Sequence, residues 1–220
     1  MNEPTEELLI RQPEPDELDA VAELLGVAMA ENPNHVAVYR GDASVRASRH
    51  ALLMRSVLGR RPGEMHLGAF CGREVVGFVA AVPSPGCQMQ WAEKARMLPS
   101  LMRLGPASLV RMLLWQHMWQ RHHPTVAHLH IGPLAVHHDW RGRGLGRELL
   151  DAVLASHGSD VGRRRAYLET DREVNVGFYR ADGFTVVSEG DVLGQANWFM
   201  ERCSETRTYE RIQAYQPPIS

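Results

Sequence analysis

Cysteine, net charge and long apolar runs are all scarce in this 220-residue chain, and each scarcity excludes a class of protein. The three cysteines, Cys71, Cys87 and Cys203, are an odd number at unrelated spacings, and none lies in a metal-ligand pattern. Such usage is typical of reduced thiols rather than of a disulfide framework. A formal net charge of −2 predicts neither a nucleic-acid partner nor binding to a membrane surface. No apolar run approaches the roughly 20 residues that a bilayer-spanning helix needs.

The remaining composition is that of an ordinary globular protein. Hydrophobic residues make up 44% of the chain and charged residues 23%, and its length allows one sizeable core. Residues 1–19 are acidic and contain proline, so they lack the basic-then-apolar order of a secretory signal. We therefore expect a cytoplasmic protein in which residues 1–220 form a single domain. The oligomeric state stays open, with a homodimer as one candidate.

Hydrophobic periodicity and turn residues predict alternating strands and helices, as in an α/β domain built on a mixed sheet. Gly132-Pro133 predicts a bulge inside the fourth strand, because proline cannot donate to a sheet ladder. Asn32-Pro33-Asn34 is expected to end the first helix, and Thr170-Asp171-Arg172-Glu173 has the order of a capping box. Strands are expected at 8–11, 64–71, 74–82, 125–136, 166–169, 184–188 and 197–202. Helices are expected at 15–30, at 43–58, from Leu145 to a cap at Gly158, and from the 170–173 segment to Asp182-Gly183.

Residues 88–123 are the least standard part of the pattern. Apolar side chains recur at helical spacing on both sides of Pro106, which predicts two helices. One interpretation is a helical pair that packs on the sheet. The other is a lid over an acceptor pocket, because methionine and tryptophan form adaptable apolar walls. The two interpretations are compatible.

The most informative stretch is an apolar strand that runs through a glycine-rich turn into an amphipathic helix. Leu134-Ala135-Val136 is followed by Arg141-Gly142-Arg143-Gly144-Leu145-Gly146. Glycines let the backbone approach a ligand closely, and a helix start offers unpaired N–H donors and a partial positive charge. With the arginines, this arrangement predicts a cradle for a pyrophosphate, with a flexible loop as the alternative. It is neither a Walker loop nor the dinucleotide GxGxxG turn, because no Gly-Lys-Ser/Thr follows and the third glycine comes one residue early.

A second segment follows about 25 residues downstream of this turn, counted along the printed sequence. The strand Leu168-Glu169-Thr170 leads to Asn175, Phe178-Tyr179 and Gly183-Phe184. Asn175 and Tyr179 are four residues apart, so they share one face of a helix. The alternatives to a functional role are a solvated amide for Asn175 and a half-buried ring for Tyr179.

In this order and spacing, the two segments resemble the signatures of the GNAT superfamily of N-acetyltransferases. The resemblance implies the acyl-CoA N-acyltransferase fold, in which helices flank a mixed, mostly antiparallel sheet, here with a helical insertion near 88–123. It also implies acetyl-CoA as co-substrate, with Asn175 bonding the cofactor arm and Tyr179 protonating the departing thiolate. Leu134, Ala135 and Val136 would bond the pantetheine arm, and Arg141, Gly142, Arg143, Gly144, Leu145 and Gly146 would hold the pyrophosphate.

The implied reaction moves an acetyl group to a primary amine, and a small molecule is the expected acceptor. Finer details, including the segment Gly183-Phe184-Thr185-Val186 and Trp198, resemble the puromycin-type antibiotic acetyltransferases. A protein N-terminus or a lysine is an alternative acceptor. A non-catalytic acyl-CoA-binding module is the alternative from another class, and the intact Tyr179 favours the enzyme.

Acetyl transfer to an amine requires a proton acceptor. An alkylamine with a pKa near 10.4 must lose a proton first, which costs about 4.6 kcal/mol at pH 7. His128 and His130 precede the bulge and share one face of their strand. Histidines in this strand resemble those of the arylalkylamine-type acetyltransferases, which relay the amine proton. We expect His130 to be the general base, with Glu169 as a weaker candidate and a polar strand face as the alternative interpretation.

Histidines are dense between residues 117 and 138. No HxxxH pair with an adjacent glutamate lies on a helix, so we expect surface and pocket histidines and no bound metal. No serine or cysteine lies in a nucleophile elbow, which favours direct transfer without a covalent enzyme intermediate. The histidines are His117, His122, His123, His128, His130, His137 and His138.

Overall fold

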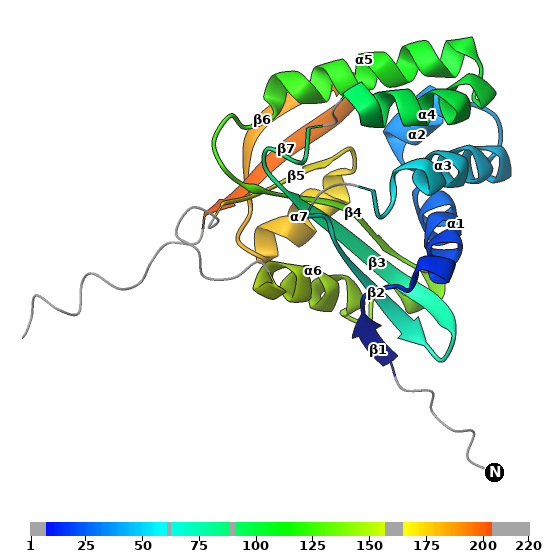
Figure 1. The fold of residues 1–220 in the computed structure, drawn as a ribbon. Coiled ribbons are helices and arrows are strands. Elements are labelled where there is room, and N and C mark those ends of the chain that lie inside the picture. The colour runs from blue at the N-terminus through cyan, green and yellow to red at the C-terminus, as the bar shows by residue number, and fades with distance from the viewer. Residues whose placement is uncertain (1–7, 61–62, 89–90, 157–164, 204–220) are drawn as a thin grey trace, which may run out of the picture.

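Seven strands form one sheet with helices on both of its faces (Figure 1). The computed structural model describes residues 8–60, 63–88, 91–156 and 165–203, and the helix cap expected at Gly158 lies outside these ranges. The strand order is β1-β2-β3-β4-β5-β7-β6, and every neighbouring pair is antiparallel except β4 with β5. The expected mixed, mostly antiparallel sheet is therefore confirmed. The strands are β1 (Leu8–Arg11), β2 (Met65–Cys71), β3 (Glu74–Pro83), β4 (Leu129–Val136), β5 (Arg165–Thr170), β6 (Thr185–Val192) and β7 (Gln195–Cys203).

The helices pack on the sheet because the side chains of the strands alternate between its two faces. Val79 of β3 packs in the hydrophobic cluster that contains α6, whereas Phe78 and Ala80 pack in the cluster that contains α1. The described helices include none with the length and apolarity to cross a bilayer. The helices are α1 (Leu18–Met29), α2 (Pro33–Tyr39), α3 (Ala43–Val57), α4 (Trp91–Arg103), α5 (Pro106–His122), α6 (Leu145–Ser156) and α7 (Glu173–Ala181), with single 3-10 turns at Pro15–Glu17 and His138–Trp140.

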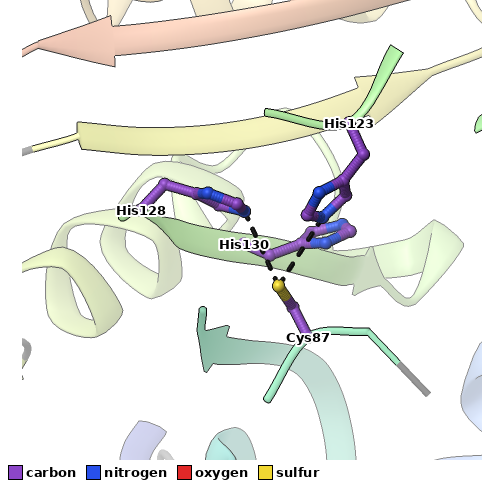
Figure 2. Close-up of side chains that lie close together, drawn as sticks. All are labelled: Cys87, His123, His128 and His130. Atoms are coloured by element: carbon purple, nitrogen blue, oxygen red, sulfur yellow. Dashed lines mark hydrogen bonds between the residues drawn. The ribbon is translucent and has the colours of Figure 1, made fainter. Parts of the chain in front are cut away.

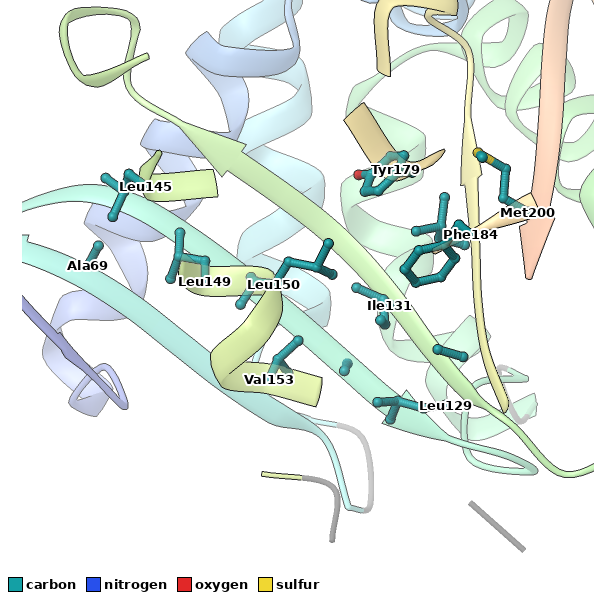
Figure 3. Close-up of a cluster of buried hydrophobic side chains, with 14 of the residues drawn as sticks. Ala69, Leu129, Ile131, Leu145, Leu149, Leu150, Val153, Tyr179, Phe184 and Met200 are labelled. Atoms are coloured by element: carbon teal, nitrogen blue, oxygen red, sulfur yellow. The ribbon is translucent and has the colours of Figure 1, made fainter. Parts of the chain in front are cut away.

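The largest cluster of buried side chains lies under α6 and α7 (Figure 3). Leu149, Leu150 and Val153 occupy one face of α6 and are fully buried against the sheet. Burial of one such side chain contributes about 1.5–3 kcal/mol. Phe184 and Tyr179 extend the same cluster toward β5 and β7. The glycine-rich turn before α6 and the α7 tyrosine are therefore held by one packed core.

The parallel strands β4 and β5 separate soon after they meet, and this separation creates the site. Their pairing consists of Leu129 with Ala166 and His130 with Tyr167. Beyond that point, Leu134 pairs with β3 on one side only, opposite Val79. The register of β3 and β4 shifts at this place, which confirms the bulge expected at Gly132-Pro133. The open edge of β4 faces the space beside α7.

The helical insertion is confirmed as the pair α4 and α5, which lies across one end of the molecule (Figure 1). Helix α4 contacts α3, and α5 contacts α2 and β6. Met97, Met112 and Trp115 are buried in a third hydrophobic cluster between these helices. The insertion therefore shares a core with α2 and α3, and this core attaches it to the rest of the domain.

The expected end of the first helix is confirmed, because α1 stops at Met29, just before Asn32-Pro33-Asn34. The helix α2 that begins at Pro33 was not predicted, although proline fits the first turn of a helix. The capping box before α7 does not form, since Arg172 occupies the cap position without a side-chain cap bond. The Thr170 hydroxyl instead accepts from the Arg172 N–H at 3.3 Å and from the Asn175 amide at 3.1 Å.

Candidate functional site

Two cavities meet where β4 and β5 separate. The turn cavity, of ≈ 550 Å³, lies between the end of β4, the glycine-rich turn and α7. The helix cavity, of ≈ 340 Å³, is bounded by α1, α3, α4, α5 and the middle of β4. Five residues line both cavities, so a group that spans the two passes between them: Met29, Asn32, Leu134, Asn175 and Tyr179.

The turn cavity contains nearly all of the residues expected to bind a cofactor. Arg143 is the exception, because its guanidinium lies 5.0 Å from the Trp140 ring centroid and does not line the cavity. The residues that do line it are Leu134, Ala135, Val136, Arg141, Gly142, Gly144, Leu145, Gly146, Asn175 and Tyr179.

The turn requires glycine because of its backbone conformation. Gly142 and Gly144 have φ values of +76° and +87°, a region that other L-residues rarely adopt. A Cβ on Gly142 would meet nothing within 4 Å, and one on Gly144 would meet only the Glu148 carboxylate at 3.9 Å. The space beside the turn is therefore open. Helix α6 begins directly afterwards at Leu145, and the first turn of a helix has amides without intrahelical acceptors.

Asn175 and Tyr179 lie on the same face of α7, as their spacing predicts, at the junction of the cavities. The Asn175 amide is oriented by its bond to Thr170. Tyr179 is buried, and burial raises the pKa of its hydroxyl. A phenol with a raised pKa stays protonated at neutral pH, so it can donate a proton to a leaving group.

The helix cavity has apolar walls and a polar floor. Its walls come largely from methionine, leucine and tryptophan side chains, several of them on α4 and α5. The insertion therefore both packs on the domain and lines a pocket. At the floor, the Asp171 carboxylate accepts the backbone N–H of Asn34 at 2.8 Å, and burial raises the pKa of Asp171. His130 and Glu169 lie beside it.

His130 and Glu169 form a close pair. The His130 Nε2 stands 2.8 Å from the Glu169 Oε2, and the Glu169 side chain is almost fully buried. Burial lowers the pKa of His130, but the Glu169 charge and the Cys87 thiol outweigh this and raise the pKa to about 9. The predicted base thus lines the helix cavity with one ring nitrogen already engaged.

The fold also brings together four residues that sequence reasoning did not connect: Cys87, His123, His128 and His130. Burial raises the pKa of the Cys87 thiol, but the three imidazoles outweigh this and lower the pKa to about 4. In the sequence no cysteine lies in a metal-ligand pattern, whereas the fold brings Cys87 together with three histidines. The density of histidines from 117 to 130 was the one signal available.

Comparison with known proteins identifies the fold. The profile described as the acetyltransferase (GNAT) family matches residues 39–184. No curated protein matches the sequence. Among solved structures, the chain is similar to a histone acetyltransferase HPA2 and related acetyltransferase from Corynebacterium glutamicum, with 14% identity, 91% of this chain and 98% of that chain covered, and a TM-score of 0.63.

Two further structures have the same fold. A polyamine N-acetyltransferase from Drosophila melanogaster is 16% identical over 90% of this chain and 100% of that chain, with a TM-score of 0.59. NAA60 from Arabidopsis thaliana in complex with acetyl-CoA is 13% identical over 90% of this chain and 98% of that chain, with a TM-score of 0.53. At these identities the similarity establishes the architecture, whereas the residues of the two cavities must be interpreted from their own chemistry.

Proposed function

The chain belongs to the acetyltransferase (GNAT) family and is an N-acetyltransferase, and from this premise we propose that it acetylates a primary amine of a small molecule with acetyl-CoA. The observation that carries the proposal is the meeting of the two cavities at Leu134, Asn175 and Tyr179. The turn cavity would hold the cofactor, and the helix cavity would hold the acceptor. The thioester would then lie at the junction.

The turn cavity fits a pyrophosphate joined to an extended arm. The glycine-rich turn and the start of α6 direct N–H groups and a partial positive charge into open space, which suits a pyrophosphate. The residues Leu134–Val136 pair with β3 on one side, so their other edge can bond the amides of the pantetheine arm as a neighbouring strand would. Arg141 is anchored by a bond to the Val136 carbonyl at 3.1 Å, beside this edge.

Tyr179 is the proposed general acid. Acetyl-CoA supplies an acyl thioester, and attack by the amine nitrogen forms the amide C–N bond as the C–S bond breaks. The Tyr179 hydroxyl has no hydrogen-bond partner among the described residues, so it is free to donate its proton to the departing sulfur. The raised pKa keeps it protonated until then.

The helix cavity favours an amine with an apolar body. Glu169 and Asp171 place carboxylates at a floor that is surrounded by apolar walls, which attracts an ammonium group and the body attached to it. A cavity of ≈ 340 Å³ covered by α4 and α5 suits a small molecule better than a folded protein surface. The resemblance to puromycin-type enzymes stays a prediction.

The route of the amine proton also stays a prediction. His130 lines the helix cavity, but its Nε2 bonds Glu169, and its pKa of about 9 keeps the other nitrogen, Nδ1, largely protonated at neutral pH. A chain of water molecules leading out of the cavity is the alternative acceptor. Three further points are also predictions: residues 1–220 form one domain, the protein acts in the cytoplasm, and it forms a homodimer.

A panel of small amines tests the proposal. The full chain is incubated with acetyl-CoA and each amine, and the release of free thiol is followed. Apolar primary amines should release thiol well above the rate without amine, and Tyr179→Phe should suppress this release. Binding of acetyl-CoA by calorimetry without thiol release for any amine or peptide would instead identify a non-catalytic acyl-CoA-binding module. Release with N-terminal peptides alone would identify a protein acetyltransferase.

A further inference from the structure

Four side chains converge on one point beside the helix cavity (Figure 2). The Cys87 sulfur lies 3.6 Å from the Nε2 of His123 and 3.6 Å from the Nε2 of His128. His130 completes the group, and the four potential ligand atoms all lie within 4.8 Å of one another. Cys87 and His128 are buried and His123 and His130 are half-buried, and all but His128 also line the helix cavity.

In each imidazole, the ring nitrogen that does not face the centre of the group contacts a supporting oxygen. The Nδ1 atoms of His123 and His128 lie 3.1 Å and 2.8 Å from the backbone carbonyls of Pro124 and Val126. A carbonyl can only accept, so each Nδ1 carries the hydrogen and each Nε2 presents a lone pair to Cys87. This support by a carbonyl or carboxylate is the usual arrangement behind a metal-binding histidine.

In His130 the two ring nitrogens exchange roles, so that Nε2 contacts the supporting oxygen and Nδ1 is the candidate metal ligand. Its Nε2 faces the Glu169 carboxylate at 2.8 Å, and its Nδ1 is buried without a hydrogen-bond partner among the described residues. A buried nitrogen without a partner costs free energy, so the protein alone does not satisfy this group. Three imidazole nitrogens and a sulfur thus point at a centre in which few protons are available to bridge them.

We propose that Cys87, His123, His128 and His130 bind one divalent metal ion, with Zn²⁺ as the ion that this ligand set favours. Around tetrahedral Zn²⁺, a sulfur at about 2.3 Å and a nitrogen at about 2.05 Å stand roughly 3.6 Å apart. This value matches both distances from the Cys87 sulfur. One cysteine with three histidines is a ligand set of the nitrogen and sulfur type that zinc takes.

The charges also balance. A thiolate on Cys87 and the carboxylate of Glu169 behind His130 together offset the two positive charges of the ion. The ion needs a thiolate on Cys87 and a lone pair on His130 Nδ1, so protons carried by these two groups are released to solvent on binding. A second group, His137, His138 and Asp139, is more exposed and has no sulfur, so it is the weaker candidate.

The position of the site indicates its role. Cys87 directly precedes the helical insertion and His123 directly follows α5, whereas His128 and His130 belong to the sheet region. An ion bound by all four would close the base of the insertion and fix it over the helix cavity. Because the ion would occupy Nδ1 of His130, this residue could not accept the amine proton in the metal-bound protein. The metal-site proposal does not depend on the proposed acetyl transfer, because metal binding is measured without an activity assay.

Metal content is the first test. The tag-free full chain is produced with zinc in the medium, desalted and analysed for metals, and about one zinc per chain is expected. Glu169→Gln should weaken zinc binding by roughly 10–100-fold, as loss of a group that supports a metal ligand does. Cys87→Ser and His128→Gln should weaken it more. Cys203→Ser and His117→Gln, which alter exposed residues of the same types, should retain the zinc.

Cobalt substitution of the unmutated chain tests the site without depending on the folding of a variant. Co²⁺ added to chelator-treated protein should produce the ligand-field bands of a tetrahedral ion and a thiolate-to-cobalt charge-transfer band. Failure of the unmutated chain to take up zinc or cobalt overturns the proposal. So does an octahedral spectrum without thiolate charge transfer, or a wild-type amount of zinc in folded Cys87→Ser. A Cys87 acetyl thioester in place of metal would also overturn it, in favour of a nucleophilic cysteine.

Discussion

The sulfur of Cys87 lies 3.6 Å from the Nε2 of His123, although 36 positions separate the two residues in the chain. Those positions contain α4 and α5, so one contact closes the base of the whole insertion. The walls of the helix cavity depend on the same two helices. The stability of this contact therefore bears on the shape of the acceptor pocket.

Removing zinc should loosen the insertion more than the sheet. Free zinc at 100 times its dissociation constant stabilises the binding form by about 2.7 kcal/mol, which is about 100-fold in an opening equilibrium. Hydrogen exchange of α4 and α5 should accelerate by up to about that factor after chelation, whereas exchange in α6 should not change. In Cys87→Ser the chelator should have no effect. Equal acceleration in all helices would show that the ion does not act locally.

Gly144→Glu should abolish acetyl-CoA binding in calorimetry. The new side chain enters the open space beside the turn and adds a charge that repels a pyrophosphate. Because Gly144 has a φ of +87°, the substitution also carries a backbone cost of about 1–2 kcal/mol. Gly194→Glu is the matched control, since Gly194 has a φ of +81° but lies in the turn between β6 and β7. Wild-type affinity in folded Gly144→Glu would mean that the cofactor binds elsewhere.

Tyr179→Phe should lower kcat by about 10²–10⁴-fold, as loss of a general acid does. Acetyl-CoA affinity and stability should change little, because the substitution removes only a hydroxyl that has no hydrogen-bond partner among the described residues and leaves the buried ring in place. Single-turnover measurements keep product release from hiding the effect. An unchanged chemical step would assign protonation of the thiolate to another donor.

His130→Gln and His128→Gln distinguish metal binding from base catalysis. If both histidines are metal ligands, both substitutions should remove zinc and destabilise the insertion to a similar degree. If His130 is the base, its substitution should slow acetyl transfer with zinc retained, and His128→Gln should have little effect. We expect the first result, measured as zinc content beside kcat for the two variants.

Acid should destabilise the protein through the buried His50. Burial lowers the pKa of His50 from 6.5 to about 4, and burial also lowers the pKa of its neighbour His35. Between pH 6.5 and 4 the unfolded chain therefore binds protons that the folded chain does not, so the free energy of unfolding decreases as the pH falls through this window. Urea unfolding at several pH values should show this slope, and His50→Asn should reduce it. An unchanged slope would show that other groups dominate.

Residue order alone was enough to predict the elements whose chemistry is local. The strand Leu134–Val136, the turn after it and the start of α6 form one continuous run, so residue order alone places backbone amides, glycines and arginines together. The four-residue spacing of Asn175 and Tyr179 likewise places both on one helix face. Hydrophobic periodicity predicted the central strands and the insertion, because burial of one face produces that pattern whatever the partner.

Local rules were incomplete at two places. Thr170 was expected to cap α7 in a capping box, but its hydroxyl accepts from the Arg172 N–H and the Asn175 amide, both within five residues of it. Helix α2, which begins at Pro33, was not predicted, and it packs against the distant helix α5, a contact that no local window includes.

The composition of the two cavities and of the cysteine–histidine group depends on contacts between distant segments, which residue order does not reveal. The helix cavity is assembled from helices of three separate segments, and Cys87 reaches His128 across 41 positions. Periodicity reports which face of an element is buried, but not which element covers it. The meeting of Cys87 with three histidines depends on how β3, the insertion and β4 pack, and that packing is set by the whole core rather than by any one stretch of sequence.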